Sequence, residues 1–171
     1  MGVVGVIGGC ATVTDGEPKA DSADAPAYRT SVSVSAAESA ATSSALESER
    51  RESLTTQAIH SACETMSTSS ADAIDAVNTY VDAANGEGGG DPLAAEGPAA
   101  DALNHSADLV AADIGDALPQ QLRDALSAWV DAARGAATAI TERVPPDAFN
   151  VAIRQVNDTR STALDLCDTH Y

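Results

Sequence analysis

Two histidines and two cysteines far apart in the chain have the spacing of a metal site. His60 precedes Cys63 by three residues, and His170 follows Cys167 by three residues. On helices, each such pair shares a face, so the four side chains together form a candidate Cys2His2 zinc set. The alternative is a disulfide between the two sulfurs, which an oxidising compartment favours and which removes both thiolate ligands. We predict the disulfide and no bound metal.

Motifs of the common enzyme classes are missing from the sequence. It contains no Gly-x-Ser-x-Gly elbow, no Walker loop, no His-Glu-x-x-His and no Cys-x-x-Cys. The third histidine, His105, has no evident partner in the sequence. Converging carboxylates could act as acid and base or bind Ca²⁺, but the Asp residues alternate with apolar positions, which predicts that they form a solvated outer coat. These are Asp72, Asp75, Asp82, Asp101, Asp108, Asp113, Asp116, Asp124 and Asp131. We expect no catalytic residue, no enzyme activity and no cofactor.

Four large side chains define a candidate ligand pocket. Tyr80, Trp129 and Phe149 fall on or beside apolar stripes, and Arg160 interrupts one. Aromatic residues at helical spacing are core residues by default, and the Arg160 stem can cover the core while its charged head stays in water. The alternative is a pocket between helices, in which the rings line a ligand and Arg160 meets an anion or a buried carboxylate.

Apolar residues repeat with a helical period in four segments, which positions all of these side chains. The segments end, in order, at Asn85-Gly86, before Gly115, at Pro145-Pro146 and near Cys167; we expect the second to begin near Pro98 and Asp147 to cap the fourth. Similar lengths and short connections predict an all-α, antiparallel up-and-down four-helix bundle. We expect a turn between Gly115 and Pro119. A single rod kinked at Pro119 would instead give a three-helix bundle.

The up-and-down order brings two of the three cysteines together. Cys63 lies near the start of the first helix and Cys167 near the end of the fourth, so both fall at one pole. We therefore predict a Cys63–Cys167 disulfide, which would stabilise a core that is rich in Ala and poor in large side chains. The three-helix alternative also brings the two cysteines to one level, so the bond indicates a bundle without settling its helix count.

The N-terminal sequence, MGVVGVIGGC, is too short to span a bilayer, which takes about 20 apolar residues. Ile7, Gly8 and Gly9 directly before Cys10 resemble the lipobox of bacterial lipoproteins, in which the cysteine is diacylated. No Lys or Arg precedes the apolar run, and a start codon upstream of Met1 would supply the missing part of the signal. The alternative is a Gly-rich cytoplasmic N-terminus. With its Ala-rich helical style, the chain resembles an uncharacterised extracytoplasmic lipoprotein of mycobacterial type, which implies a truncated signal peptide over residues 1–10 and acylation of Cys10.

Between Cys10 and the helical segments the composition changes twice. Residues 11–30 mix Pro, Gly, Asp and Ser without periodicity, which predicts a disordered tether. Residues 31–58 are rich in Ser and Ala, which predicts a marginal helix or stalk, helical from about Ala36. We expect the helical bundle domain to span residues 59–171.

The charge balance restricts the partners. The chain has 26 acidic and 9 basic residues and a formal net charge of -17, so we expect no nucleic acid partner, because phosphates are held by Lys and Arg.

Two candidate functions remain. The first is a lipid-anchored or secreted cell-envelope bundle, held at the outer face of the cell membrane through Cys10, that acts as a structural or protein-interaction module with an envelope protein as partner. The second is an extracytoplasmic small-molecule carrier or sensor that binds its ligand between helices near Trp129.

Overall fold

The computed structural model describes residues 25–87 and 89–170, with side chains from residue 30 onward. This part of the chain forms four helices: α1 (Ala25–Ala84), α2 (Pro92–Asp113), α3 (Gln120–Thr141) and α4 (Pro146–Asp168). The chain divides into two compact units, Met1–Leu46 and Glu47–Tyr171. The expected all-α class is confirmed.

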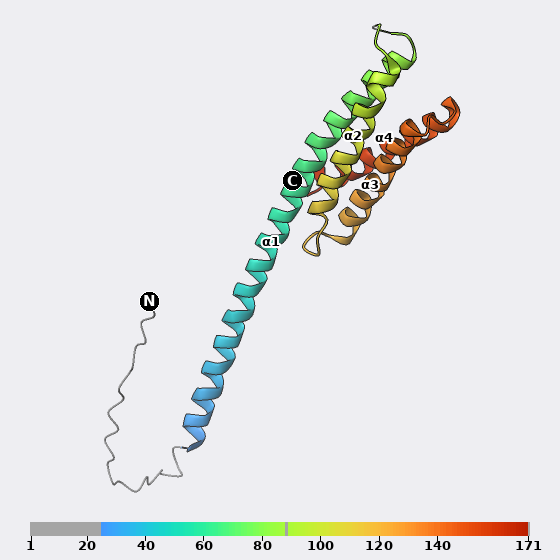
Figure 1. Cartoon of the computed structure of the whole chain (residues 1–171). Helices are drawn as coiled ribbons and strands as arrows, with labels where there is room; N and C mark the ends of the chain where they lie inside the picture. The colour runs from blue at the N-terminus through green and yellow to red at the C-terminus, as the bar shows by residue number, and fades with distance from the viewer. Residues whose placement is uncertain (1–24, 88, 171) are drawn as a thin grey trace, which may run out of the picture. The chain divides into compact units, whose positions relative to one another are not determined.

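In the second unit, neighbouring helices run antiparallel (Figure 1). α2 and α4 contact the C-terminal part of α1, and α3 packs against α2 and α4. Each of three helix pairs is joined by two contacts at different heights along the bundle, and these contacts fix the relative direction of the two helices. They are Thr65 to Asp113 and Ser69 to Ser106 between α1 and α2, Asp108 to Arg134 and Glu96 to Arg143 between α2 and the end of α3, and Cys63 to Cys167 and Tyr80 to Phe149 between α1 and α4. In each pair the residue number rises on one helix as it falls on the other. The up-and-down four-helix bundle is confirmed.

The turn at Pro119 separates α2 from α3. α2 ends at Asp113, Ile114 is its C-cap, and Pro119 occupies the N-cap position of α3 with φ -57° and ψ 143°. A proline has no N–H to donate and disfavours helical geometry in the residue before it, so a helix does not pass through this position undisturbed. Leu118 is 3% exposed and anchors the turn on the core. The alternative of one kinked rod and three helices is wrong.

The sequence predicts that α2 begins near Pro98, but the helix begins six residues earlier, at Pro92. The side chain of Asp91 accepts a hydrogen bond from the backbone N–H of Leu93 at 3.0 Å, and Pro92 occupies the first helical turn. An Asp N-cap followed by Pro is a strong start signal, because it satisfies a free N–H and uses a residue that has none. Pro98 consequently lies inside α2.

The connection between α3 and α4 differs from the expected cap. Pro145 occupies the N-cap position of α4 and makes no side-chain capping bond, whereas Asp147 lies in the first turn, where its negative charge is favourable near the helix N-terminus. Before it, Arg143 has φ 51°, and its N–H donates to the Ile140 carbonyl at 3.0 Å. Its guanidinium Nε donates to Oε2 of Glu96 at 2.7 Å, which raises the pKa of Arg143 and links this connection to α2.

α1 is longer than the sequence predicts. It begins at Ala25, so the last part of the expected tether over residues 11–30 is helical, and so is all of the expected stalk over 31–58. Ala and Glu, which have high intrinsic helix propensity, favour the helix in this segment. Side chains at positions 30–46 are exposed, and the first buried side chain of α1 is Ile59. The expectations for residues 1–24, including Cys10, lie outside the described residues.

One exposed ion-pair cluster stabilises α1 where the second unit begins. Glu47 accepts hydrogen bonds from Nε of Arg50 at 3.0 Å and from Nε of Arg51 at 2.9 Å, at helical spacings of three and four residues. The bonds from Arg50 and then Arg51 lower the pKa of Glu47 from 4.5 to about 2. Because all three side chains are exposed, solvent and salt screen the energetic effect.

The core combines a few large side chains with many alanines. The large side chains that are almost completely buried are Met66, Leu103, Val110, Leu122, Leu126, Trp129 and Ile140. Ala133 and Ala136 of α3 are 0% exposed, and their small size lets neighbouring helices approach closely. Within the described residues, no helix is both long enough and apolar enough to cross a membrane.

Candidate functional site

The predicted disulfide is confirmed. Sγ of Cys63 and Sγ of Cys167 are 2.01 Å apart, the Cα atoms are 5.7 Å apart, and both residues are 3% exposed. The bonded sulfurs are not thiolates and do not serve as zinc ligands. Across residues 25–87 and 89–170, no group of three or more His, Cys, Asp or Glu side chains is arranged to hold a metal ion.

The end of the bundle that contains this bond, which we call the disulfide pole, also carries His60 and His170. Both histidines border a cleft of about 200 Å³, together with Thr56 and Ile59. His60 also borders an adjoining cleft of about 360 Å³, which is further lined by Cys63, Glu64, Ser67, Thr68, Leu164, Cys167 and Asp168. The structure therefore brings together all four residues of the candidate zinc set, with the sulfurs oxidised and the imidazoles exposed.

Tyr80 and Phe149 meet at the other end of the bundle. Their ring centroids are 5.9 Å apart and the ring planes make an angle of 69°. In this edge-to-face arrangement the positive edge of one ring meets the negative face of the other, which is electrostatically favourable. They border a cleft of about 280 Å³ together with Val144 and Asn150. Two of the four residues of the candidate ligand pocket are thus side by side.

Trp129 is a residue of α3 and lies in the core of the bundle, away from this cleft. It is 1% exposed, and its Nε1 has no hydrogen-bond partner among the described residues. The contacts of Asp108 with Arg134 and of Asp113 with Thr65 place Trp129 level with Thr65. This is about 20 Å along the bundle axis from Tyr80, at a rise of about 1.5 Å per residue. Trp129 borders none of the clefts that His60 or Tyr80 borders.

Arg160 is half-buried on α4 and reaches α1. Its Nε donates a hydrogen bond at 2.8 Å to Oγ of Ser70, which is 0% exposed. Ser70 lies ten residues from Tyr80 on α1, which is about 15 Å along the helix. Arg160 therefore packs at a separate level from Tyr80. Its buried partner is a neutral hydroxyl.

Sequence reasoning missed a small polar layer between α1 and α2. Oγ of Ser106 donates to Oγ of Ser69 at 2.7 Å, and Ser69 in turn donates to the carbonyl of Thr65 at 2.7 Å. Thr65 donates to the carboxylate of Asp113 at 2.6 Å, so this Asp is half-buried, whereas the others expected on outer faces are exposed. In a chain this rich in Ser and Ala, helical spacing does not distinguish a buried Ser from an exposed one.

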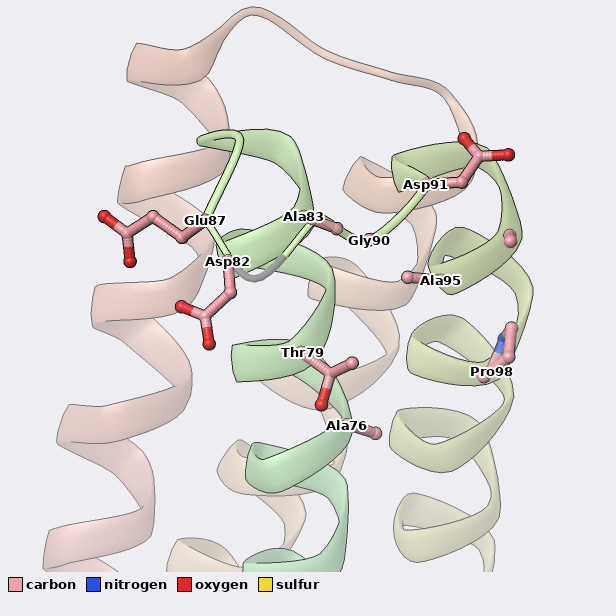
Figure 2. Close-up of a pocket in the computed structure, with 10 residues that line it drawn as sticks. Ala76, Thr79, Asp82, Ala83, Glu87, Gly90, Asp91, Ala95 and Pro98 are labelled. Carbon is pink, nitrogen blue, oxygen red and sulfur yellow. The ribbon is translucent and has the colours of Figure 1, made fainter.

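An open cleft of about 650 Å³ lies between the end of α1 and the start of α2. Figure 2 shows the carboxylates of Asp82 and Glu87 on one side and that of Asp91 on the other, with small side chains between them. At Gly90, a Cβ atom would lie 3.2 Å from Cβ of Ala83, so the connection passes close to α1. The cleft has an apolar floor and an acidic rim.

Comparison with known proteins places this architecture in a family. A family model described as the Rv2240c four-helix bundle domain matches residues 45–168. The chain is 50% identical over 167 residues to the "Uncharacterized protein MT2300" of Mycobacterium tuberculosis (strain CDC 1551 / Oshkosh), a match that covers 98% of this chain and 82% of that protein. No solved structure matches the chain. The expected relationship to an uncharacterised protein of mycobacterial type is confirmed.

Proposed function

We propose that this chain, which belongs to the Rv2240c four-helix bundle domain family, is a non-catalytic structural or protein-interaction module of the cell envelope. Cys10, which lies outside the described residues, would carry the lipid that holds it at the outer face of the cell membrane. The bundle would then act through its surface, because the largest side chains of its core, Trp129, Met66 and Leu126, are packed inside the bundle.

The Cys63–Cys167 disulfide carries this proposal. Disulfides form and persist in oxidising compartments and are rare in the cytoplasm, where thiols are kept reduced. The bond joins residues that are 104 positions apart, so it closes nearly the whole bundle. A lasting link of this kind supports export.

The net charge of -17 indicates the chemistry of the partner. Opposite charges accelerate association, whereas like charges oppose it, so the partner is an envelope protein with a basic surface. The acidic rim formed by Asp82, Glu87 and Asp91 is one place where such a surface would be favoured.

The experiment is an intact-mass measurement on the native protein from fractionated cells, alkylated under non-reducing conditions. We expect the membrane fraction to contain the protein, with Cys63 and Cys167 unalkylated and with acyl chains on Cys10. Reduction before alkylation is the positive control for both thiols. A Cys10→Ala variant should leave the membrane fraction. Alkylated Cys63 and Cys167 in a cytoplasmic protein would contradict export.

A small-molecule carrier or sensor is the second candidate, and the buried Nε1 of Trp129 favours it. This N–H has no partner among the described residues, and a buried polar group without a hydrogen bond is costly. A ligand that accepts this hydrogen bond would change the fluorescence of Trp129, which is the single Trp of the chain. Titration with lipids, sterols and small acids tests this function. Unchanged fluorescence throughout would contradict it.

A further inference from the structure

We propose that His60 and His170 form a binding site for a divalent late transition-metal ion, with Cu²⁺ the preferred occupant. The disulfide sets the register of α1 against the end of α4, and each histidine lies three residues beyond its cysteine, in the direction of the same pole. The two residues therefore lie at the same level of the bundle. Both are exposed and both border the cleft of about 200 Å³.

The chemistry of these donors selects the metal. Imidazole nitrogen suits Cu²⁺, Ni²⁺ and Zn²⁺, and affinity among divalent first-row ions is greatest for Cu²⁺. A tetragonal Cu²⁺ ion accepts two nitrogens and completes its coordination with oxygen. Solvent supplies that oxygen at an exposed site. The described side chains form no group of three ligands, so the proposed site has two protein donors.

The disulfide has a positioning role at this site. It keeps the Cα atoms of Cys63 and Cys167 at 5.7 Å, about one helical turn from the histidines. Holding two donors in place before the ion arrives reduces the ordering cost of binding. The net charge of -17 also raises the local concentration of cations around the chain. The site therefore differs from a Cys2His2 zinc site, because it requires the oxidised sulfurs.

The third histidine of the chain supplies a matched control. His105 is an exposed residue of α2, as His60 and His170 are exposed at the disulfide pole. Tag-free, disulfide-bonded full-length protein that carries Cys10→Ala, so that no free thiol binds or reduces the ion, is titrated with Cu²⁺ against glycine as competitor, and its electron paramagnetic resonance spectrum is recorded. We expect about one Cu²⁺ per chain, and a loss of affinity of about tenfold or more for His60→Ala and for His170→Ala. His105→Ala should bind as the parent does.

The spectrum separates this site from binding to surface carboxylates. Nitrogen hyperfine structure from two imidazoles should fall to that of one imidazole in either single variant. Unchanged affinity in His60→Ala or His170→Ala, an equal loss in His105→Ala, or a spectrum with oxygen ligands alone would overturn the proposal. Circular dichroism checks the fold of each variant, and His60→Gln replaces His60→Ala if the latter is unfolded. A Cys63→Ala/Cys167→Ala variant should bind Cu²⁺ more weakly than the parent, and equal binding would refute the positioning role.

Discussion

Breaking the Cys63–Cys167 bond should remove about 4.7 kcal/mol from the free energy of unfolding. The two cysteines are 104 residues apart, so the bond closes a long loop in the unfolded chain. The chain-entropy relation, about -2.1 - 1.5R ln n in cal/mol/K, gives about -16 cal/mol/K for a loop of this length, or about 4.7 kcal/mol at 25 °C. The stabilisation arises because the bond restricts the unfolded state.

This magnitude is large for a single domain. Native domains are stable by about 5–15 kcal/mol, so the bond accounts for about a third or more of the total. With a urea dependence of about 2 kcal/mol per M, the midpoint of unfolding should fall by about 2 M. Both cysteines are 3% exposed, and their replacement by Ala also removes two buried sulfur atoms, which adds a small cost in packing.

The assay is urea unfolding, followed by far-UV circular dichroism, of a Cys63→Ala/Cys167→Ala variant and its parent. Both carry Cys10→Ala, so that no third thiol is present. Reductant is added while the chain unfolds and refolds, so that it reaches the buried bond. The urea midpoint of the parent should then fall close to that of the variant, and the midpoint of the variant should not change. A loss of stability below about 1 kcal/mol would refute the reasoning, because the unfolded chain would then gain little freedom when the loop is opened.

Three further predictions test the packing and the charges. Leu126 is 0% exposed, so Leu126→Ala should cost about 2–5 kcal/mol in urea unfolding, and a loss below about 1 kcal/mol would show that the core is looser than described. Arg160→Met keeps the apolar stem but removes the hydrogen bond to Ser70, so it should cost about 1 kcal/mol, and Arg160→Ala should cost more by the same measurement because the stem is lost as well. Equal costs would contradict packing of the stem. The side-chain carboxylate of Glu47 should titrate by NMR with a pKa of about 2 at low salt and move toward 4.5 in high salt. Because the folded-state pKa is lowered, the stabilisation is present above pH 4.5 and is lost as the pH falls toward 2; a value near 4.5 at low salt would disprove the ion pair.

Most features of the fold that the sequence predicts depend on the chemistry of a few neighbouring residues. Helical spacing around Met66, Leu103 and Leu126 predicted which faces are buried, because period depends only on the geometry of one helix. Pro119 predicted a turn because it lacks an N–H. The start of α2 was predicted too late, although Asp91 and Pro92 together are a local start signal.

The sequence by itself determined the class of the fold and the pairing of Cys63 with Cys167, because these follow from periodicity and from the order of antiparallel helices. Only the tertiary structure decided that Tyr80 contacts Phe149 while Trp129 lies about 20 Å away, and that Ser69 is buried against Ser106. Such distances depend on the rotation and register of each helix against its neighbours. In a chain whose stripes consist largely of Ala and Ser, several registers satisfy the same pattern, and the packing of all four helices together selects one of them.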